Sequence, residues 1–261
     1  MAIPLFLAMT GAEMQKNGPF PPNIAWMACH FSPYGTGISN IPEELPNGSM
    51  IILNDRTPVC GHDPERVAEQ MLQLVEQFRA EAILLDFQRP DVAETAAIAS
   101  RIVQQCTCPV GVTEYYAREW KCPVFLSPVP PHIPLDEYLA PWQGREIWLE
   151  AALDGTEIVV KPEGCTSTAC PYPTPAEHSH WDERLHCHYE ITTTSEQVRF
   201  RLYRTEEDLA QLLDAAGLMG VTRAVGLYQE LAQHTIAQPS HNTEHSKQIP
   251  GDCHVACGSS Q

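Results

Sequence analysis

Short apolar runs rich in β-branched and aromatic residues recur along the chain and predict buried strands. Most of these runs are nearly continuous in apolar character, which is typical of strands covered on both faces. The eight runs span residues 3–9, 24–31, 49–54, 82–87, 109–113, 123–127, 146–153 and 221–228. A closed parallel barrel of the TIM type has eight such strands.

Helical patterns separate several of the runs. Apolar residues at helical spacing form one stripe over 64–79, and Asp63 precedes that stretch as a predicted N-cap. Residues 91–104 repeat the pattern, and Thr205 is expected to cap a third helix that ends at Gly217. Strand, helix and strand in this order imply parallel pairing. The sequence therefore predicts an α/β fold, a distorted (β/α)8 TIM-like barrel, with an open α/β sheet as the alternative.

Two parts of the chain depart from the barrel pattern. Proline, glycine and asparagine dominate 17–23 and 33–48, so no helix is predicted between the first three strands. Residues 157–161 and 187–203 alternate between apolar and polar side chains, which favours antiparallel strands. We therefore expect an antiparallel hairpin inserted at about 155–204, before the last helix.

Length and charge narrow the class of protein. A chain of 261 residues with 43% hydrophobic and 19% charged residues suits one barrel-sized domain, predicted over 1–232. The polar stretch 233–261 has no apolar period and is predicted to be a disordered tail. The formal charge of −17 argues against nucleic acid and anionic membranes as partners, because its field repels phosphates.

The N-terminal run and the cysteines bear on location. The run 3–9 contains Pro4 and has no basic residue before it, so it is predicted to be a buried strand and not a signal peptide. No apolar run has the length needed to span a bilayer. Without an export signal, the ten cysteines are expected to be reduced thiols in a cytoplasmic protein. Cys106 and Cys108 form a Cys-x-Cys pair, which we interpret as core or loop thiols.

Polar residues at the strand ends are the candidate site. The fourth run ends in Asp86, with Gln88 two residues further, which is where barrel enzymes place catalytic groups. The structural alternative is that Asp86 caps the following turn. His30 and Asn54 close the second and third runs, and Glu114 follows the fifth. Because strand ends converge in a barrel, these side chains are expected to face one cavity, with Tyr34 and Tyr115 as aromatic contacts for a ligand.

At this strand the sequence resembles the glycoside hydrolase family 18 barrels, the chitinases and their relatives. Their fourth strand ends in an Asp-x-Asp-x-Glu pattern, whose Glu protonates the glycosidic oxygen. Here the pattern is Leu84-Leu85-Asp86-Phe87-Gln88, so only the carboxylate next to the acid position is retained. Glutamine has no titrating proton and cannot act as a general acid. The resemblance therefore implies a carbohydrate site in which position 88 does not perform the family's acid step.

Other carboxyl groups are candidates for that step. Besides Asp86 and Glu114, Glu150 lies in the Trp148-Leu149-Glu150 stretch of the seventh run, and Glu230 follows Tyr228 and Gln229 at the close of the eighth. A suitably spaced carboxyl pair would support hydrolysis. The structural alternatives are a buried arginine partner for Glu150 and a solvated surface position for Glu230. Trp148, Tyr228 and Glu230 are accordingly predicted only as ligand contacts.

A second cluster has the ligand types that zinc prefers. Its candidate ligands are Cys165, Cys170, His178 and His186. The spacings form no tight Cys-x-x-Cys pair, and residues 162–181 are interpreted as a proline-rich loop, so no metal or other cofactor is assigned. No phosphate-binding glycine loop, nucleophile elbow or HExxH motif is present in the sequence.

These observations support one leading hypothesis and two alternatives. The first is a barrel that binds a small-molecule or oligosaccharide ligand. Because Gln88 stands at the acid position, the sequence does not decide whether this barrel also hydrolyses the ligand. The second is a non-catalytic barrel that binds a metabolite or a protein. The third is a zinc-dependent hydrolase that uses the cluster at 165–188. The sequence does not determine the substrate or the oligomeric state.

Overall fold

Eight parallel strands form a closed barrel in the computed structural model, which describes residues 3–16, 20–57, 61–89, 92–118, 120–171 and 178–231. The strands are β1 (Leu5–Met9), β2 (Ile24–Phe31), β4 (Met50–Asn54), β5 (Ala82–Asp86), β6 (Val110–Thr113), β7 (Val124–Leu126), β8 (Ile147–Ala151) and β14 (Val221–Leu227). Each pairs with the next, and β1 pairs with both β2 and β14, which closes the ring. The predicted TIM-like barrel is confirmed. The tail predicted at 233–261 lies outside the described residues.

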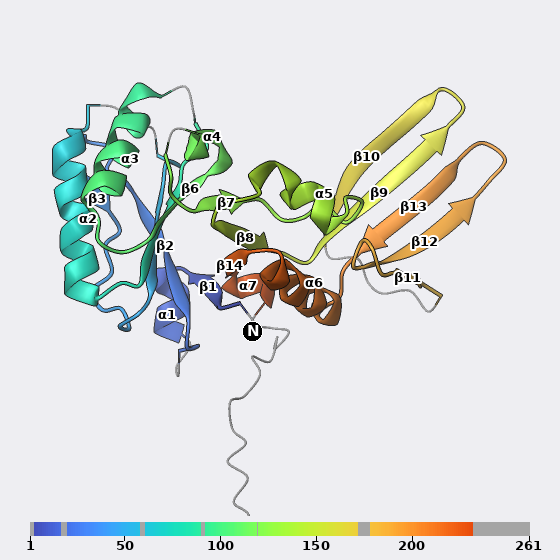
Figure 1. Cartoon of the computed structure of the whole chain (residues 1–261), viewed down its shortest axis with the longest axis horizontal. Coiled ribbons are helices and arrows are strands. Elements are labelled where there is room, and N and C mark those ends of the chain that lie inside the picture. Colours follow the sequence, from blue (N-terminus) through green and yellow to red (C-terminus); the bar gives the residue numbers. More distant parts are fainter. Residues whose placement is uncertain are drawn as a thin grey trace, which may run out of the picture.

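Three longer helices pack on the outside of the barrel (Figure 1). They are α2 (Pro64–Phe78), α3 (Ala93–Gln105) and α6 (Glu206–Leu218). The Asp63 side chain accepts a hydrogen bond from the Glu65 amide at 3.1 Å, so this residue caps α2 as the sequence predicted. Thr205 and Asp208 form a capping box at the start of α6. Helix α6 extends one residue beyond Gly217, which therefore lies within the helix.

Short elements complete the barrel. They are α1 (Gly11–Lys16), β3 (Ile38–Ser39), α4 (Glu114–Ala117), α5 (Leu135–Leu139), a 3-10 helix (Ala140–Trp142) and α7 (Tyr228–Leu231). Helix α1 was not predicted, because six residues are too few to show a helical stripe. Its start is stabilised by the Glu13 carboxylate, which accepts hydrogen bonds from the amide and hydroxyl of Thr10 at 2.7 and 2.8 Å. Strand β3 pairs antiparallel with the end of β2.

The chain leaves the barrel after β8 to form a second, antiparallel sheet that projects to one side (Figure 1). Its strand order is β10-β9-β13-β12-β11. The bounds are β9 (Asp154–Lys161), β10 (Gly164–Pro171), β11 (His180–Asp182), β12 (Cys187–Thr193) and β13 (Val198–Tyr203). The insertion is therefore antiparallel, as predicted, but has five strands.

The interpretation of 162–181 as a loop was wrong for β10 and β11. All eight residues of β10 pair with β9. Its side chains are small and mostly exposed, so the burial that would produce an alternating pattern is missing. Pairing with a neighbouring strand, which the local sequence does not encode, makes this segment a strand.

A buried arginine attaches the second sheet to the barrel. Arg204 donates to the carbonyls of His186 at 3.0 Å and Leu185 at 3.1 Å, and also to the carbonyl of Val129 in the loop after β7. Burial lowers the pKa of this guanidinium to about 10. The Cys187 thiol, also buried, donates to the Pro131 carbonyl at 3.4 Å. These contacts fix the base of the insertion against the rim of the barrel.

Two apolar cores hold the fold together. The larger lies between the strands and the surrounding helices, and the smaller fills the inside of the barrel. The inner core consists of Phe6, Ala8, Ala25, Met50, Ile52, Ala82, Leu84, Phe125, Trp148 and Val225. The barrel is thus a packed core with space only near its ends. Among the helices in the described part of the chain, none has the length and apolar character to cross a membrane.

Candidate functional site

Two cavities lie at the C-terminal ends of the barrel strands, where the sequence predicted the site. The outer cavity has a volume of about 940 Å³ and the inner cavity about 210 Å³. Both are lined by Met27, Asn54, Asp86 and Gln88. The outer cavity extends over His30, Asn40, Arg56 and Arg89, and the inner one reaches Leu84, Phe125 and Glu150. The structure therefore brings His30, Asn54, Asp86, Gln88 and Glu150 to one mouth.

The end of β5 presents alternate residues to the inner cavity. Leu84, Asp86 and Gln88 all line it, as expected because side chains two apart in a strand point to the same face. These are the positions that correspond to the three acidic residues of the family 18 pattern.

Asp86 and Gln88 form a direct hydrogen bond. Gln88 Nε2 donates to Asp86 Oδ1 at 2.6 Å. Burial raises the pKa of Asp86, the bond from Gln88 opposes this rise, and the negative charge of Asp55 adds to it. The pair therefore presents one carboxylate whose charge is partly stabilised by the neighbouring amide.

Asp55 fixes the loop that carries Gln88, a role that the sequence analysis missed. Both oxygens of this buried carboxylate accept a hydrogen bond from the backbone N–H of Gln88 at 3.1 Å. One of them also accepts from the backbone N–H of Arg89 at 3.0 Å. Its position directly after the end of β4 was the available signal. The contacts hold the end of β5 against the end of β4.

The polar groups of Asn54 and His30 are engaged with the backbone. Asn54 Nδ2 donates to the carbonyls of Met27 and Cys29 at 3.2 and 3.0 Å. His30 Nδ1 lies 3.0 Å from the Ala28 carbonyl, and because a carbonyl only accepts, Nδ1 carries the hydrogen there. Asn54 thus joins β2 to β4, while the His30 ring is oriented at the edge of the outer cavity.

Glu150 has the most perturbed carboxyl group at the mouth. Burial is the main cause that raises its pKa to about 7, and the negative charges of Asp86, Asp154 and Glu230 add to the rise. No arginine forms an ion pair with Glu150 within the described ranges, so the predicted arginine partner is not observed. A carboxyl with such a pKa can both donate and accept a proton near neutral pH.

Three predicted site residues do not line the two cavities. Glu114 is exposed at the start of α4. Burial raises the pKa of Tyr138 to about 12, and the negative charges of Glu114 and Glu150 contribute to this rise. Tyr115 is 52% exposed and Tyr34 is 87% exposed. None of the three lines either mouth cavity, because each lies on a loop or helix that begins beyond the strand end.

Three further predicted contacts are structural. Trp148 is fully buried inside the barrel, and its indole nitrogen donates to Glu146 Oε1 at 3.1 Å. Tyr228 packs against the outer core. Glu230 is buried and accepts a hydrogen bond from the Leu153 backbone amide after β8, so the alternative of a solvated surface position for Glu230 is wrong. These residues support the mouth without lining its cavities.

The candidate zinc ligands do not converge. Cys165 and Cys170 lie on β10 at one edge of the second sheet, whereas His178 and His186 flank β11 at the other edge. No group of three or more His, Cys, Asp or Glu side chains in the described residues is arranged to hold a metal ion. The zinc-dependent hydrolase hypothesis therefore lacks the ligand set that it requires.

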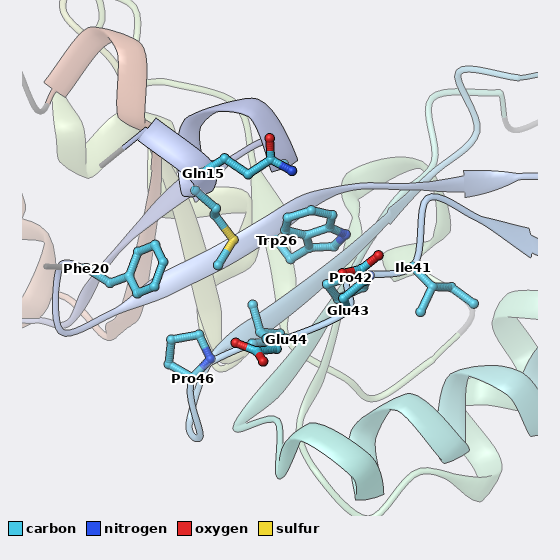
Figure 2. Close-up of a pocket in the computed structure, with 11 residues that line it drawn as sticks. Gln15, Phe20, Trp26, Ile41, Pro42, Glu43, Glu44 and Pro46 are labelled. Carbon is cyan, nitrogen blue, oxygen red and sulfur yellow. The ribbon is translucent and has the colours of Figure 1, made fainter. Parts of the chain in front are cut away.

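A third cavity of about 570 Å³ lies on the outer flank of β2. Figure 2 shows Trp26 at its floor, with Phe20 and Pro46 to one side and Ile41 to the other. The indole nitrogen of Trp26 donates to the Asn40 carbonyl at 3.0 Å. Exposed Glu43 and Glu44 complete the lining. Apolar side chains form most of its walls, and its polar side chains are Gln15, Glu43 and Glu44.

Comparisons with known proteins identify similar folds. No family model matches the sequence, and a search of curated proteins found no match. The spore cortex-lytic enzyme SleL of Bacillus cereus is 11% identical, with a TM-score of 0.53 over 86% of this chain and 70% of that chain. The SleL enzyme of Bacillus megaterium QM B1551 is 9% identical, with a TM-score of 0.51 and the same coverage.

Chitinase ChiW from Paenibacillus sp. str. FPU-7 is similar over 88% of this chain, with a TM-score of 0.56 and 10% identity, and the match covers 42% of the larger enzyme. At such low identities these similarities show the fold alone. The chain shares its TIM-like barrel fold with these three proteins.

Proposed function

We propose that the chain binds a carbohydrate at the mouth of the barrel and that Glu150 supplies the proton that Gln88 cannot. The observation that carries this proposal is the shared inner cavity lined by Asp86, Gln88 and Glu150. The fold agrees with it, because the similar structures named above include a chitinase and two spore cortex-lytic enzymes. The resemblance of the fourth strand to glycoside hydrolase family 18 indicates the same ligand class.

The size of the mouth suits a sugar ligand. The outer cavity of about 940 Å³ lies within the range of roughly 300–1,000 Å³ common for small-molecule sites. The inner cavity of about 210 Å³ is smaller, so one ring of a longer ligand would occupy the outer space and direct polar groups inward. Asp86 accepts hydrogen bonds and Gln88 both donates and accepts them, which suits sugar hydroxyl groups.

Glu150 has the acid–base properties that hydrolysis requires. With a pKa of about 7, it is partly protonated near neutral pH, whereas glutamine at position 88 has no proton to transfer. In the proposed reaction Glu150 protonates the glycosidic oxygen, the bond from that oxygen to the anomeric carbon breaks, and Asp86 stabilises the positive charge that develops on the sugar. Water then adds to the anomeric carbon and gives one proton to the Glu150 carboxylate, which restores the acid. A carboxyl pair of this kind is the usual requirement for glycoside cleavage.

A second candidate function is binding without hydrolysis. The 2.6 Å hydrogen bond between Gln88 and Asp86 favours it, because this bond occupies the carboxylate with an amide that cannot give up a proton. In this case the mouth recognises a glycan and releases it unchanged.

Binding is tested with purified protein and chito-oligosaccharides, in parallel with other glycans, by calorimetry and thermal shift. A glycan is expected to bind wild type and to lose at least tenfold in affinity with Asp86→Ala. Asp214→Ala, an exposed position on α6, is the matched control and should bind as wild type does. Equal binding by Asp86→Ala, or no glycan binding by wild type, would contradict the proposal.

Hydrolysis is tested on the glycan that binds. Glu150→Gln should abolish cleavage and retain binding, whereas Glu114→Gln, an exposed carboxyl near the mouth, should retain both. Cleavage that appears only in Gln88→Glu would support the binding function and overturn the acid role of Glu150.

A further inference from the structure

The turn between α3 and β6 brings two thiol groups together. Cys106 is the first residue after α3, and Cys108 follows it before β6 begins. Their sulfur atoms lie 3.3 Å apart, and both side chains are partly exposed while they pack against the outer core. This turn precedes a barrel strand, so it lies at the end of the barrel opposite to Asp86. The pair is independent of the proposed carbohydrate site.

We propose that Cys106 and Cys108 are an oxidation site at which a low-molecular-weight disulfide, such as oxidised glutathione, converts the two thiols to a reversible intramolecular disulfide. The sulfur atoms need to approach by about 1.2 Å to reach the disulfide bond length of about 2.05 Å. Rotation of two partly exposed side chains can provide a movement of that size. A bridge across one intervening residue closes a small ring, which makes it readily reducible.

The two thiols have different roles. Hydrogen bonding from Cys108 lowers the pKa of Cys106 to about 7, against the effect of burial. The same hydrogen bond and burial raise the pKa of Cys108, which the nearby Arg223 partly opposes. Because the thiolate is the nucleophile, Cys106 is the attacking group and Cys108 the resolving group.

The exchange proceeds in two balanced steps. The Cys106 thiolate attacks one sulfur of oxidised glutathione, forms a mixed disulfide and releases one glutathione thiolate. Cys108 then loses its proton to that thiolate, and its sulfur attacks the Cys106 sulfur and releases the second glutathione. The two protein thiols are oxidised by two electrons, and one glutathione disulfide is reduced to two thiols.

Most of the other cysteines that the structure describes are less suited to this reaction. Cys29, Cys122 and Cys187 are buried, and burial raises the pKa of each thiol. Cys165 is exposed but lies five residues from Cys170 along one strand, so their side chains point to opposite faces of the sheet. The sulfur–sulfur contact at 106–108 is the geometry that favours an internal disulfide.

The sequence allows a direct test by mass spectrometry. Trypsin cleaves after Arg101 and Arg118, and the peptide 102–118 contains Cys106 and Cys108 and no other cysteine. Folded full-length protein is incubated with oxidised glutathione, and remaining thiols are blocked with iodoacetamide before digestion. Compared with the peptide from reduced and alkylated protein, we expect this peptide to carry no alkyl group and to have two hydrogens fewer than the free dithiol. After treatment with dithiothreitol, both cysteines should again react with iodoacetamide.

Serine variants separate the two roles. Cys108→Ser should accumulate one glutathione on Cys106, because the resolving thiol is missing. Cys106→Ser should acquire glutathione on Cys108 at least tenfold more slowly. The peptide 146–184, which contains Cys165 and Cys170, is the internal control and should form no internal disulfide. Full alkylation of peptide 102–118 in wild type after oxidation, or equal rates in the two variants, would overturn the proposal.

Discussion

Replacing Glu150 by glutamine tests the electrostatics of the inner cavity directly. The substitution keeps the size of the side chain and removes its ionisation. The pKa of this carboxyl is about 7 in the folded protein, against an ordinary value of 4.5, chiefly because of burial. Between these values the folded state binds more protons than the unfolded state, so the stability that this group contributes falls as the pH rises. The contribution is fully present below pH 4.5 and is lost above pH 7.

The magnitude follows from the two pKa values. Each pKa unit corresponds to about 1.4 kcal/mol, so the rise from 4.5 to about 7 corresponds to about 3 kcal/mol. About 2–3 kcal/mol of this falls between pH 5 and pH 8. The free energy of unfolding of Glu150→Gln should therefore increase, relative to wild type, by about 2–3 kcal/mol over that interval. Asp86 and Asp154, whose negative charges also raise the pKa of Glu150, are present both in wild type and in Glu150→Gln.

Urea unfolding followed by tryptophan fluorescence measures this difference. Both proteins are unfolded at pH 5, 6, 7 and 8 at constant ionic strength. Glu196→Gln, at an exposed turn of the second sheet, is the matched control and should change stability by less than about 0.5 kcal/mol. A difference between Glu150→Gln and wild type that is the same at pH 5 and pH 8 would refute the assignment of a raised pKa to Glu150.

Two other substitutions test how the mouth and the barrel interior are built. Asp55→Asn should lower the free energy of unfolding by about 2 kcal/mol and weaken glycan binding, because the carboxylate holds the amides of Gln88 and Arg89; unchanged urea midpoints and affinity would contradict this. Gly111→Ala should lower stability by about 1–3 kcal/mol in the same assay, because a Cβ at position 111 would lie 2.4 Å from the buried ring of Trp148. A neutral effect of Gly111→Ala would mean that the ring can move.

The sequence predicts the barrel well because burial on both faces leaves a local record. The runs 49–54 and 82–87 correspond to β4 and β5 within one residue at each end. Helix α1 and strand β10 leave no such record. The former is a single short helix fixed by the Glu13 carboxylate, and the latter has small exposed side chains and becomes a strand through its partner β9.

The sequence predicts residues of the candidate site only where it also predicts the end of a strand. Asp86 and Asn54 could be placed at the mouth because each closes an apolar run. Trp148 and Glu150 are two residues apart and point to the same face of β8. Trp148 is nevertheless buried in the packed interior of the barrel, whereas Glu150 lines the inner cavity. That depth depends on how strands are staggered around the barrel, which a single strand does not encode. Loops beyond the strand ends decide the exposure of Tyr34 and Tyr115.

The second sheet enters and leaves the barrel at directly opposed positions. Gly155 at the start of β9 pairs with Tyr203 at the end of β13. Residues 155 and 203 have 47 residues between them in the sequence, yet they are one cross-strand step apart, about 5 Å between Cα atoms. A segment attached in this way can be lengthened, shortened or exchanged without altering the separation of its ends. The junction therefore lets the length of the second sheet vary while its two ends keep their places on the barrel.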